Sequence, residues 1–299
     1  MIDSTKEPEF LKLKDGRNLA YNIYGNPQGS PVFYFHGCPG SRLEGLHMDE
    51  PGKKYRFMII APDRPGMGRS DYQKKRKWLD WPEDVLQLAT HLGFERFSIM
   101  GASGGGPPVL TCAFQIPERI DIAIDMCGWA PNIGGKLYKH LAPMDRFFSR
   151  LTPVPLIFRF FFSMMGFTVK HRSGKKLMKT FESSMCDADK KMMEDEEAAV
   201  FFANDVKESF RQGSKGPTLD ALIQYRKWDF EPADISIPVH FYHGTEDRFV
   251  PHIFSETLQG IIPNSTLKSY PGEGHYSLIN KGEDVFRDMR SKLDQSVNR

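Results

Sequence analysis

The sequence predicts an α/β fold built around a mostly parallel sheet. Short runs such as VFYF and FMIIA keep apolar residues at consecutive positions, which is typical of strands covered on both faces. These runs alternate with longer helix-like stretches, as expected when a helix connects each strand to the next. The chain has 299 residues, 40% hydrophobic and 26% charged, which is enough to form a substantial core.

The predicted sheet begins with an antiparallel pair, because Asp15-Gly16 is a turn signal between residues 11–13 and the next apolar run. The predicted strands after that turn are Leu19–Tyr24, Val32–Phe35, Phe57–Ala61, Phe97–Met100, Ile120–Met126, Val239–Tyr242 and Thr266–Tyr270. The predicted helices are Arg42–Lys54, Trp81–Leu92, Val109–Ile116, His252–Ile262 and Tyr276–Leu293. Strand and helix therefore alternate in two separated parts of the chain.

The alternation stops at about residue 131 and resumes at about residue 237. The residues between are rich in Phe and Met, then acidic and helix-like at 187–210, and are broken by Gly, Ser and Pro at 213–217. Strands resume afterwards, so this segment is predicted to be an insertion. The predicted organisation is one α/β core from residues 1–130 and 237–299, with a helical insertion at 131–236.

Composition and charge exclude several classes of partner. The net charge of +2, from 40 basic and 38 acidic residues, is too balanced for nucleic acid or an anionic membrane as the main partner. The basic run at residues 74–77 is interpreted as a solvated loop. The apolar segment 151–169 is interrupted by Pro153, Pro155 and Arg159, so it is not predicted to be inserted stably in a membrane as a spanning helix. A lid over a pocket is favoured over a surface helix that dips into lipid.

The four cysteines, Cys38, Cys112, Cys127 and Cys186, form no C-x-x-C pair, which favours reduced thiols over disulfides or zinc. The first ten residues lack the apolar core of a signal peptide. A cytoplasmic location is the simplest prediction from both observations. The sequence predicts no oligomeric state.

The stretch GASGGGPP, residues 101–108, carries the strongest chemical signal. It is not a phosphate-binding loop, because Pro107 and Pro108 occupy the places of the required Lys and Ser/Thr. It also lacks the last glycine of a dinucleotide fingerprint. Its first five residues are G-x-S-x-G between a predicted strand and a predicted helix, a context that makes Ser103 a candidate nucleophile on a sharp turn. Pro107 suits the first turn of the helix, whereas Pro108 is expected to loosen that turn.

A nucleophilic serine needs a base and an orienting acid, expected in the order Ser, acid, His on loops after later strands. His275 follows the strand at 266–270 and Asp247 follows the strand at 239–242, which makes them the predicted base and acid. Glu246 and Asp125 are rival acids. The remaining histidines in or beside strands, His36, His240 and His243, are predicted to be structural.

An oxyanion hole requires two backbone N–H groups near the serine. One is predicted from Gly104, directly after Ser103. The other is predicted from Cys38, in the loop after the strand at 32–35, because Pro39 has no N–H. Cys38 is a rival nucleophile, but the sequence around it supplies no base.

Five motifs together resemble the α/β-hydrolase superfamily: HGCPGS (His36–Ser41), DRPGMGRS (Asp63–Ser70), GASGGG (Gly101–Gly106), GTEDRFVP (Gly244–Pro251) and GEGH (Gly272–His275). The resemblance covers nearly the whole chain apart from the insertion. The first two motifs are similar to the proline-iminopeptidase, epoxide-hydrolase and esterase branches. The resemblance implies an eight-stranded sheet with a helical cap inserted after strand six.

The nucleophile and the charge pattern narrow the chemistry that the resemblance implies. Ser103 stands where epoxide hydrolases and haloalkane dehalogenases of this fold use a carboxylate, which argues against both activities. The sequence shows no acidic cluster of the kind an aminopeptidase needs to bind an amine. The acidic stretch Glu194–Glu197 is interpreted as a solvated helix face. An aminopeptidase is therefore disfavoured.

The sequence thus predicts a carboxylesterase-like serine hydrolase that acts on a small, apolar ester, thioester, amide or lactone, with no metal or cofactor. Two alternatives stay open: a ligand-binding or signalling protein with little turnover, and a hydrolase of carbon–carbon bonds. Four residues of the insertion are candidates for lining an apolar substrate pocket: Phe158, Phe161, Met164 and Met165.

Overall fold

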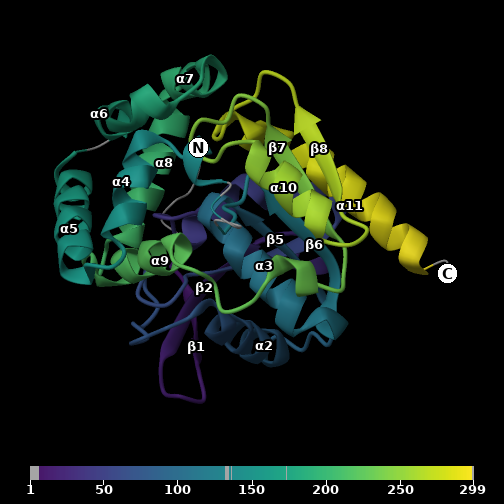
Figure 1. The fold of residues 1–299 in the computed structure, drawn as a ribbon. Helices are drawn as coiled ribbons and strands as arrows, with labels where there is room; N and C mark the ends of the chain where they lie inside the picture. The colour runs from purple at the N-terminus through teal and green to yellow at the C-terminus, as the bar shows by residue number, and fades with distance from the viewer. Residues whose placement is uncertain (1–6, 132–134, 136, 173, 298–299) are drawn as a thin grey trace.

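A computed structural model describes residues 7–131, 135, 137–172 and 174–297 (Figure 1). Its centre is an eight-stranded sheet in the order β1-β2-β4-β3-β5-β6-β7-β8. The strands are β1 (Glu9–Lys12), β2 (Asn18–Gly25), β3 (Ser30–Phe35), β4 (Phe57–Pro62), β5 (Phe97–Ala102), β6 (Ile120–Met126), β7 (Val239–Gly244) and β8 (Thr266–Tyr270). The antiparallel start is confirmed, because β1 pairs with β2 and β2 with β4 antiparallel, while the other neighbours pair in parallel.

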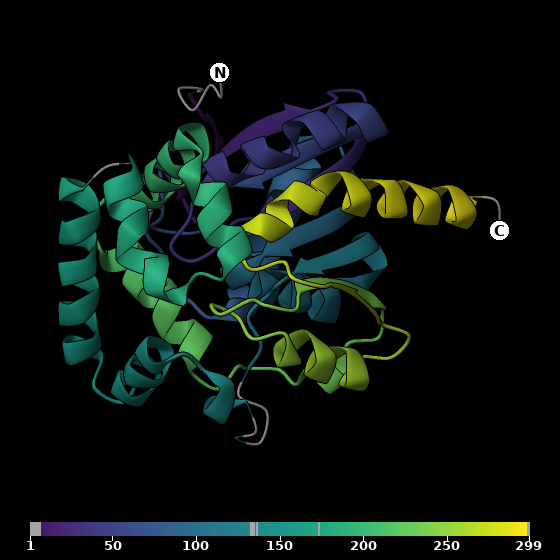
Figure 2. The same ribbon diagram turned by 90° about the horizontal axis from the view of Figure 1, so that it is seen from above.

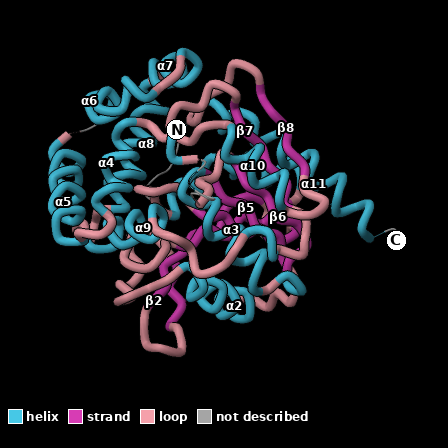
Figure 3. Tube along the Cα trace, viewed as in Figure 1, coloured by secondary structure: helices cyan, strands magenta, loops and turns pink. Residues whose placement is uncertain are grey.

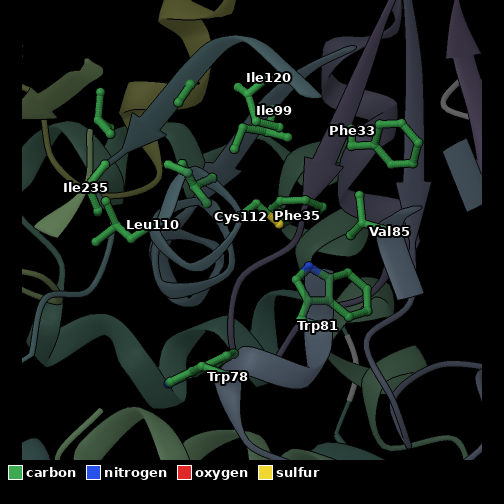
Figure 4. Close-up of a cluster of buried hydrophobic side chains, with 14 of the residues drawn as sticks. Phe33, Phe35, Trp78, Trp81, Val85, Ile99, Leu110, Cys112, Ile120 and Ile235 are labelled. Carbon is green, nitrogen blue, oxygen red and sulfur yellow. The ribbon is translucent and has the colours of Figure 1, made fainter. Parts of the chain in front are cut away.

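Helices cover both faces of this sheet, which explains the consecutive apolar residues of its strands. On one face α2 (Trp81–His91), α3 (Gly106–Gln115) and α10 (Ile253–Ile261) contribute to one apolar core with Phe33 and Phe35 of β3. Figure 4 shows the part of this core around α2 and α3. On the other face α11 (Gly282–Val297) and Met48 pack with Val32 and Tyr34 of the same strand. Neighbouring residues of β3 therefore point into two different cores.

Two predicted helices are divided in the structure. The first is a 3-10 helix (Arg42–Met48) followed by α1 (Asp49–Tyr55), and the last is a 3-10 helix (Ser277–Lys281) followed by α11. The helix after Ser103 also begins earlier than predicted: a 3-10 turn (Ser103–Gly105) leads directly into α3. Both prolines lie in the first turn of α3, where N–H groups have no partner within the helix.

The chain between β6 and β7 forms helices that gather at one end of the sheet, at the left and top of Figure 1. They are α4 (Pro143–Leu151), α5 (Pro155–His171), α6 (Gly174–Met178), α7 (Asp187–Glu194), α8 (Glu196–Ser209) and α9 (Lys215–Tyr225). We call these six helices the cap. Figure 2, viewed from above, shows them beside the sheet, and Figure 3 shows that helices account for most of this region. The division at residues 131 and 236 stays a prediction.

The cap has an apolar interior of its own and a polar junction with the core. Its interior contains Phe158, Phe162 and Phe210. At the junction Asp220 of α9 contacts Arg64 and Arg76, and all three side chains are fully buried. Arg42 is a second link, because it contacts both Asp63 of the core and Glu208 of α8 at 2.8 Å. Buried ions paired in this way hold two layers in one register.

Candidate active site

Ser103 lies at the sharp turn between β5 and α3. Its backbone has φ +54°, a conformation that costs free energy for a residue with a side chain. A Cβ atom at Gly105 would lie 2.0 Å from the carbonyl oxygen of Phe35, so only glycine fits this turn two residues after the serine. Ser103 also lines a cavity of about 200 Å³ between the sheet and the cap.

The predicted base and acid lie together. His275 Nδ1 is 2.7 Å from Asp247 Oδ2, and His275 lines the same cavity as Ser103. Asp247 Oδ1 accepts hydrogen bonds at 2.8 Å from the backbone N–H groups of Phe249 and Val250, which fix the carboxylate. The carboxylate in turn selects the tautomer of His275 that leaves Nε2 as the proton acceptor.

The electrostatic interaction between His275 and Asp247 favours an ion pair. Burial would lower the pKa of His275, but the adjacent Asp247 carboxylate outweighs burial and raises it well above its ordinary value. Burial would raise the pKa of Asp247, but His275 and His243 hold it below the usual range. The site thus stabilises the imidazolium that forms when a base takes a proton from serine.

Ser103 and His275 are not joined by a hydrogen bond in the part of the chain that the structure describes. The thiol of Cys127, just after β6, lies instead beside His275: one ligand atom each of Cys127, Asp247 and His275 lie within 4.8 Å of one another. Cys127 has φ +45° and its thiol is buried, which raises the pKa of the thiol. Catalytic hydrogen bonds often tighten only when substrate is bound, so this geometry leaves the roles of Ser103 and His275 open to test.

The predicted oxyanion groups lie beside the serine. A Cβ atom at Gly104 would be 2.7 Å from the backbone nitrogen of Cys38, so the two backbones touch. Among the described residues, the N–H of Cys38 has no hydrogen-bond acceptor, which leaves it available to a ligand. Cys38 is half-buried and lines the cavity, but desolvation and the nearby Asp220 carboxylate raise the pKa of its thiol well above the ordinary value, which argues against Cys38 as a nucleophile.

The rival residues lie elsewhere. Asp125 accepts a hydrogen bond from Gly128 N at 2.7 Å, and burial raises its pKa to about 7. Glu246 is exposed. The three histidines predicted to be structural each contact neighbouring groups: His36 binds the backbone of Gly37 and Arg64, His240 binds Thr266, and His243 contacts Asp247, Val250 and Ser255.

Three buried aspartates of the cap each bind a segment that carries candidate catalytic groups. Asp189 of α7 accepts hydrogen bonds from the backbone N–H groups of His275, Tyr276 and Ser277 at 2.9–3.1 Å. A Cβ atom at Gly274 would lie 2.4 Å from Asp189 Oδ2, so the glycine before His275 makes room for this contact. The cap therefore holds the loop that presents the candidate base.

The other two aspartates act on the candidate oxyanion loop. Asp205 of α8 accepts hydrogen bonds from the N–H of Ser41 at 2.9 Å and from its hydroxyl at 2.6 Å. Asp220 of α9 binds Arg64, whose guanidinium donates to the carbonyl oxygens of His36 and Gly37. The carbonyl of Gly37 and the N–H of Cys38 belong to one peptide group and point in opposite directions, so the bond from Arg64 to this carbonyl also fixes the direction of the Cys38 N–H.

The cavity wall contains carboxyl groups that sequence reasoning missed. Glu44, Asp145 and Asp205 line it, against the cationic side chain of Arg248. Burial raises the pKa of Glu44 to about 7 and that of Asp145 to about 6, and raises that of Asp205 well above the ordinary value. No local motif marks these residues, because they come from segments up to 161 residues apart (44 to 205).

The four predicted pocket residues of α5 have different surroundings. Met165 lines the cavity, whereas Phe158, Phe161 and Met164 are not among its lining residues. Phe158 is fully buried in the interior of the cap, Phe161 packs against that interior, and Met164 is 54% exposed. Apolar composition marks a helix that packs on both sides, but it does not say which side faces the cavity.

Comparison with known proteins agrees with this architecture. A sequence model of the alpha/beta hydrolase fold matches residues 30–282. The chain belongs to the alpha/beta hydrolase family. Within it, the chain is 35% identical to a proline iminopeptidase of Xanthomonas citri, over 111 residues that make up 34% of each protein. It is 24% identical to a bifunctional esterase/perhydrolase of Acinetobacter calcoaceticus, over 94% of this chain and 97% of that protein.

A thermophilic esterase from Thermogutta terrifontis has the same fold, with a TM-score of 0.69, 19% identity and coverage of 97% of this chain and 99% of the esterase. The family supports a hydrolase activity for this alpha/beta hydrolase. No described helix of the chain is long and apolar enough to cross a bilayer.

Proposed function

We propose that this alpha/beta hydrolase is a serine hydrolase that cleaves small, mainly apolar esters or related carbonyl compounds through an acyl-enzyme. One observation carries the proposal: Ser103, on its strained turn, lines the same cavity as His275, whose Nδ1 lies 2.7 Å from Asp247. Serine on such a turn, imidazole and carboxylate are the three groups that acyl transfer needs.

The mechanism follows from these groups. Ser103 Oγ attacks the carbonyl carbon while His275 accepts the hydroxyl proton, and the N–H groups of Cys38 and Gly104 stabilise the oxyanion. His275 then gives the proton to the leaving group as the bond to it breaks, which leaves the acyl group on Ser103. Water, deprotonated by His275, attacks the acyl carbon; the bond from that carbon to Ser103 Oγ then breaks, His275 returns the proton to Ser103, and the acid is released. Asp247 stabilises the imidazolium in both steps.

The test combines labelling with turnover. A fluorophosphonate probe is expected to label the wild-type protein but not Ser103→Ala, and short p-nitrophenyl esters are expected to be hydrolysed. Asp247→Asn is expected to lower kcat/KM by about 10⁴-fold. It is also expected to shift the acidic limb of the pH profile to lower pH, because the carboxylate that raises the pKa of His275 is gone.

Labelling that persists in Ser103→Ala would refute the assignment of the nucleophile. Labelling of Ser103 without turnover of any ester, thioester, amide or lactone would favour a ligand-binding role. Turnover of a vinylogous 1,5-diketone alone would favour carbon–carbon bond hydrolysis.

A second candidate, hydrolysis of substrates that carry an amine, is favoured by the three carboxyl groups on the cavity wall. A cationic amine between Glu44 and Asp205 would favour their ionised forms and offset the cost of burying them. The proline iminopeptidase named above is a relative over one third of the chain only. Comparing proline p-nitroanilide with its N-acetylated form separates the candidates, because only an amine-binding site prefers the free amine.

A further inference from the structure

Helix α5 has a second apolar face that no described part of the chain covers. Besides the residues that it buries in the cap, it exposes a run of large apolar side chains. They are Leu156 (82% exposed), Phe167 (67%), Phe160 (60%), Met164 (54%) and Ile157 (47%). At 100° per residue these five side chains fall within an arc of about 100° on one side of the helix.

This face continues onto α4 and to the cavity. Phe147 (43% exposed) and Met144 (56%) of α4 extend the apolar surface. We call Met144, Phe147, Leu156, Ile157, Phe160, Met164 and Phe167 the outer cap patch. Met144 also lines the cavity, so the patch is continuous with its wall. Figures 1 and 2 both place α5 at the outer edge of the molecule, on the side of the cap away from the sheet.

The charged residues of the segment that carries the outer cap patch after Met144 have one sign, whereas Asp145, next to Met144, lines the cavity. Residues 146–181 contain eight Lys or Arg and no Asp or Glu, whereas the rest of the chain has 32 basic and 38 acidic residues. Arg159 lies within α5, and Lys170 and Arg172 lie at its C-terminal end, all with exposed side chains. Lys175 and Lys176 of α6 follow, also exposed.

We propose that the outer cap patch docks on an anionic phospholipid surface, with α5 lying in the plane of the membrane interface. An exposed apolar helix face bordered by Lys and Arg is the pattern that binds such surfaces. A second copy of this chain fits less well, because a two-fold interface through the patch would bring the basic residues that border it close to those of the other copy. Docking would turn the wall at Met144 toward the membrane, from which an apolar substrate could enter.

Vesicle sedimentation tests the proposal without relying on turnover. Wild-type protein is expected to sediment with phosphatidylcholine vesicles that contain 30% phosphatidylglycerol, much less with pure phosphatidylcholine, and less as salt is raised. Phe160→Glu with Phe167→Glu should weaken binding at least tenfold, because both place a charge in the apolar face. The matched control is Phe10→Glu, which alters another exposed phenylalanine (51%), on β1, and should bind as wild type.

A second pair of variants tests the charges. Lys170→Glu with Lys176→Glu should weaken binding to anionic vesicles by roughly fivefold or more per residue. The matched control, Lys74→Glu with Lys75→Glu, changes exposed lysines of the core and should have little effect. All variants alter exposed side chains, and unchanged circular dichroism and Tm would verify that they fold.

Three results would overturn the proposal. The first is a wild-type protein that does not sediment with anionic vesicles, or that sediments equally with neutral ones at every salt concentration. The second is retention of binding by the Phe160→Glu, Phe167→Glu variant. The third is a wild-type dimer in solution that the same variant converts to a monomer, which would assign the patch to a second copy of the chain.

Discussion

The inner and outer faces of the cap are built from different helices and by opposite means: α7, α8 and α9 form the junction with the core, and α4 and α5 carry the outer cap patch. The inner face places Asp189, Asp205 and Asp220 on loops of the core, and each carboxylate is buried and bonded there. The outer face exposes large apolar side chains of α5, bordered by exposed basic ones. The contrast teaches that the cap is part of the candidate active site on one side and a free surface on the other.

The inner face also argues against a cap that lifts away as a unit. Opening the junction would break the ion pairs of Asp220 with Arg64 and Arg76 and leave charges without partners. It would also release the N–H groups of the His275 loop from Asp189. We therefore expect substrate to enter past cap side chains such as Met144 rather than through separation of the two layers.

The largest expected effect is on stability, and it comes from a substitution of Asp220 on the inner face of the cap. Asp220→Asn leaves Arg64 and Arg76 buried without a counter-charge and should lower the free energy of unfolding by about 3–5 kcal/mol. Urea denaturation measures the change. Glu231→Gln is the control, because Glu231 forms only an exposed pair with Lys227 (62% and 87% exposed) and should shift stability by less than about 0.5 kcal/mol. Equal effects of the two variants would contradict the distinction between the faces.

The next effect concerns the loop of the candidate base. Asp189→Ala removes the acceptor of three N–H groups and should lower kcat by about 10–100-fold. KM should change little, because the variant misplaces His275 but leaves the substrate pocket as it is. Asp187→Ala, on the same helix with a fully exposed side chain, should leave kcat unchanged. If Asp189→Ala changed only Tm, Asp189 would have a structural role alone.

These contacts show what the sequence could and could not predict. Ser103, Asp247 and His275 could be predicted as candidates because a turn that excludes side chains, and loops that follow strands, leave local motifs. The strands of the sheet could be predicted as well, because a strand covered on both faces leaves a local run of apolar residues. The cap aspartates leave no such mark: the acidic stretch around them has the composition of a solvated helix face, and only tertiary packing turns Asp189 and Asp205 inward. The carboxyl-lined wall is assembled from distant segments, so no spacing rule reveals it.

A smaller effect follows from the carboxyl groups that face the cavity. Burial raises the pKa of Glu44 to about 7 and of Asp145 to about 6, above their values of roughly 4 in an unfolded chain. The folded state therefore keeps protons that the unfolded state releases, and stability should fall as pH rises from about 4 to 7. We expect Glu44 and Asp145 to contribute a loss of about 1–3 kcal/mol in the free energy of unfolding between pH 5 and pH 8. The side chains of His36, His47 and His240 act in the opposite direction, because burial lowers their pKa values.

Neutral variants isolate this contribution. Glu44→Gln and Asp145→Asn cannot ionise, so each should reduce the loss of stability between pH 5 and pH 8. The exposed Glu246 gives the control, because Glu246→Gln should keep the wild-type pH dependence. If Glu44→Gln and Asp145→Asn kept the wild-type pH dependence, the cavity wall would already be ionised in the folded state.

The smallest effect uses two adjacent methionines that point to opposite faces of the cap. Met165 lines the cavity and Met164 is 54% exposed on the outer face. Met165→Ala removes apolar contact with a bound acyl chain and should raise KM for a p-nitrophenyl octanoate about tenfold, with a smaller change for the acetate. Met164→Ala should change KM for the octanoate and for the acetate less than twofold, but should weaken sedimentation with anionic vesicles. If the two variants exchanged these effects, α5 would be turned the other way in solution, and the assignment of both faces would be reversed.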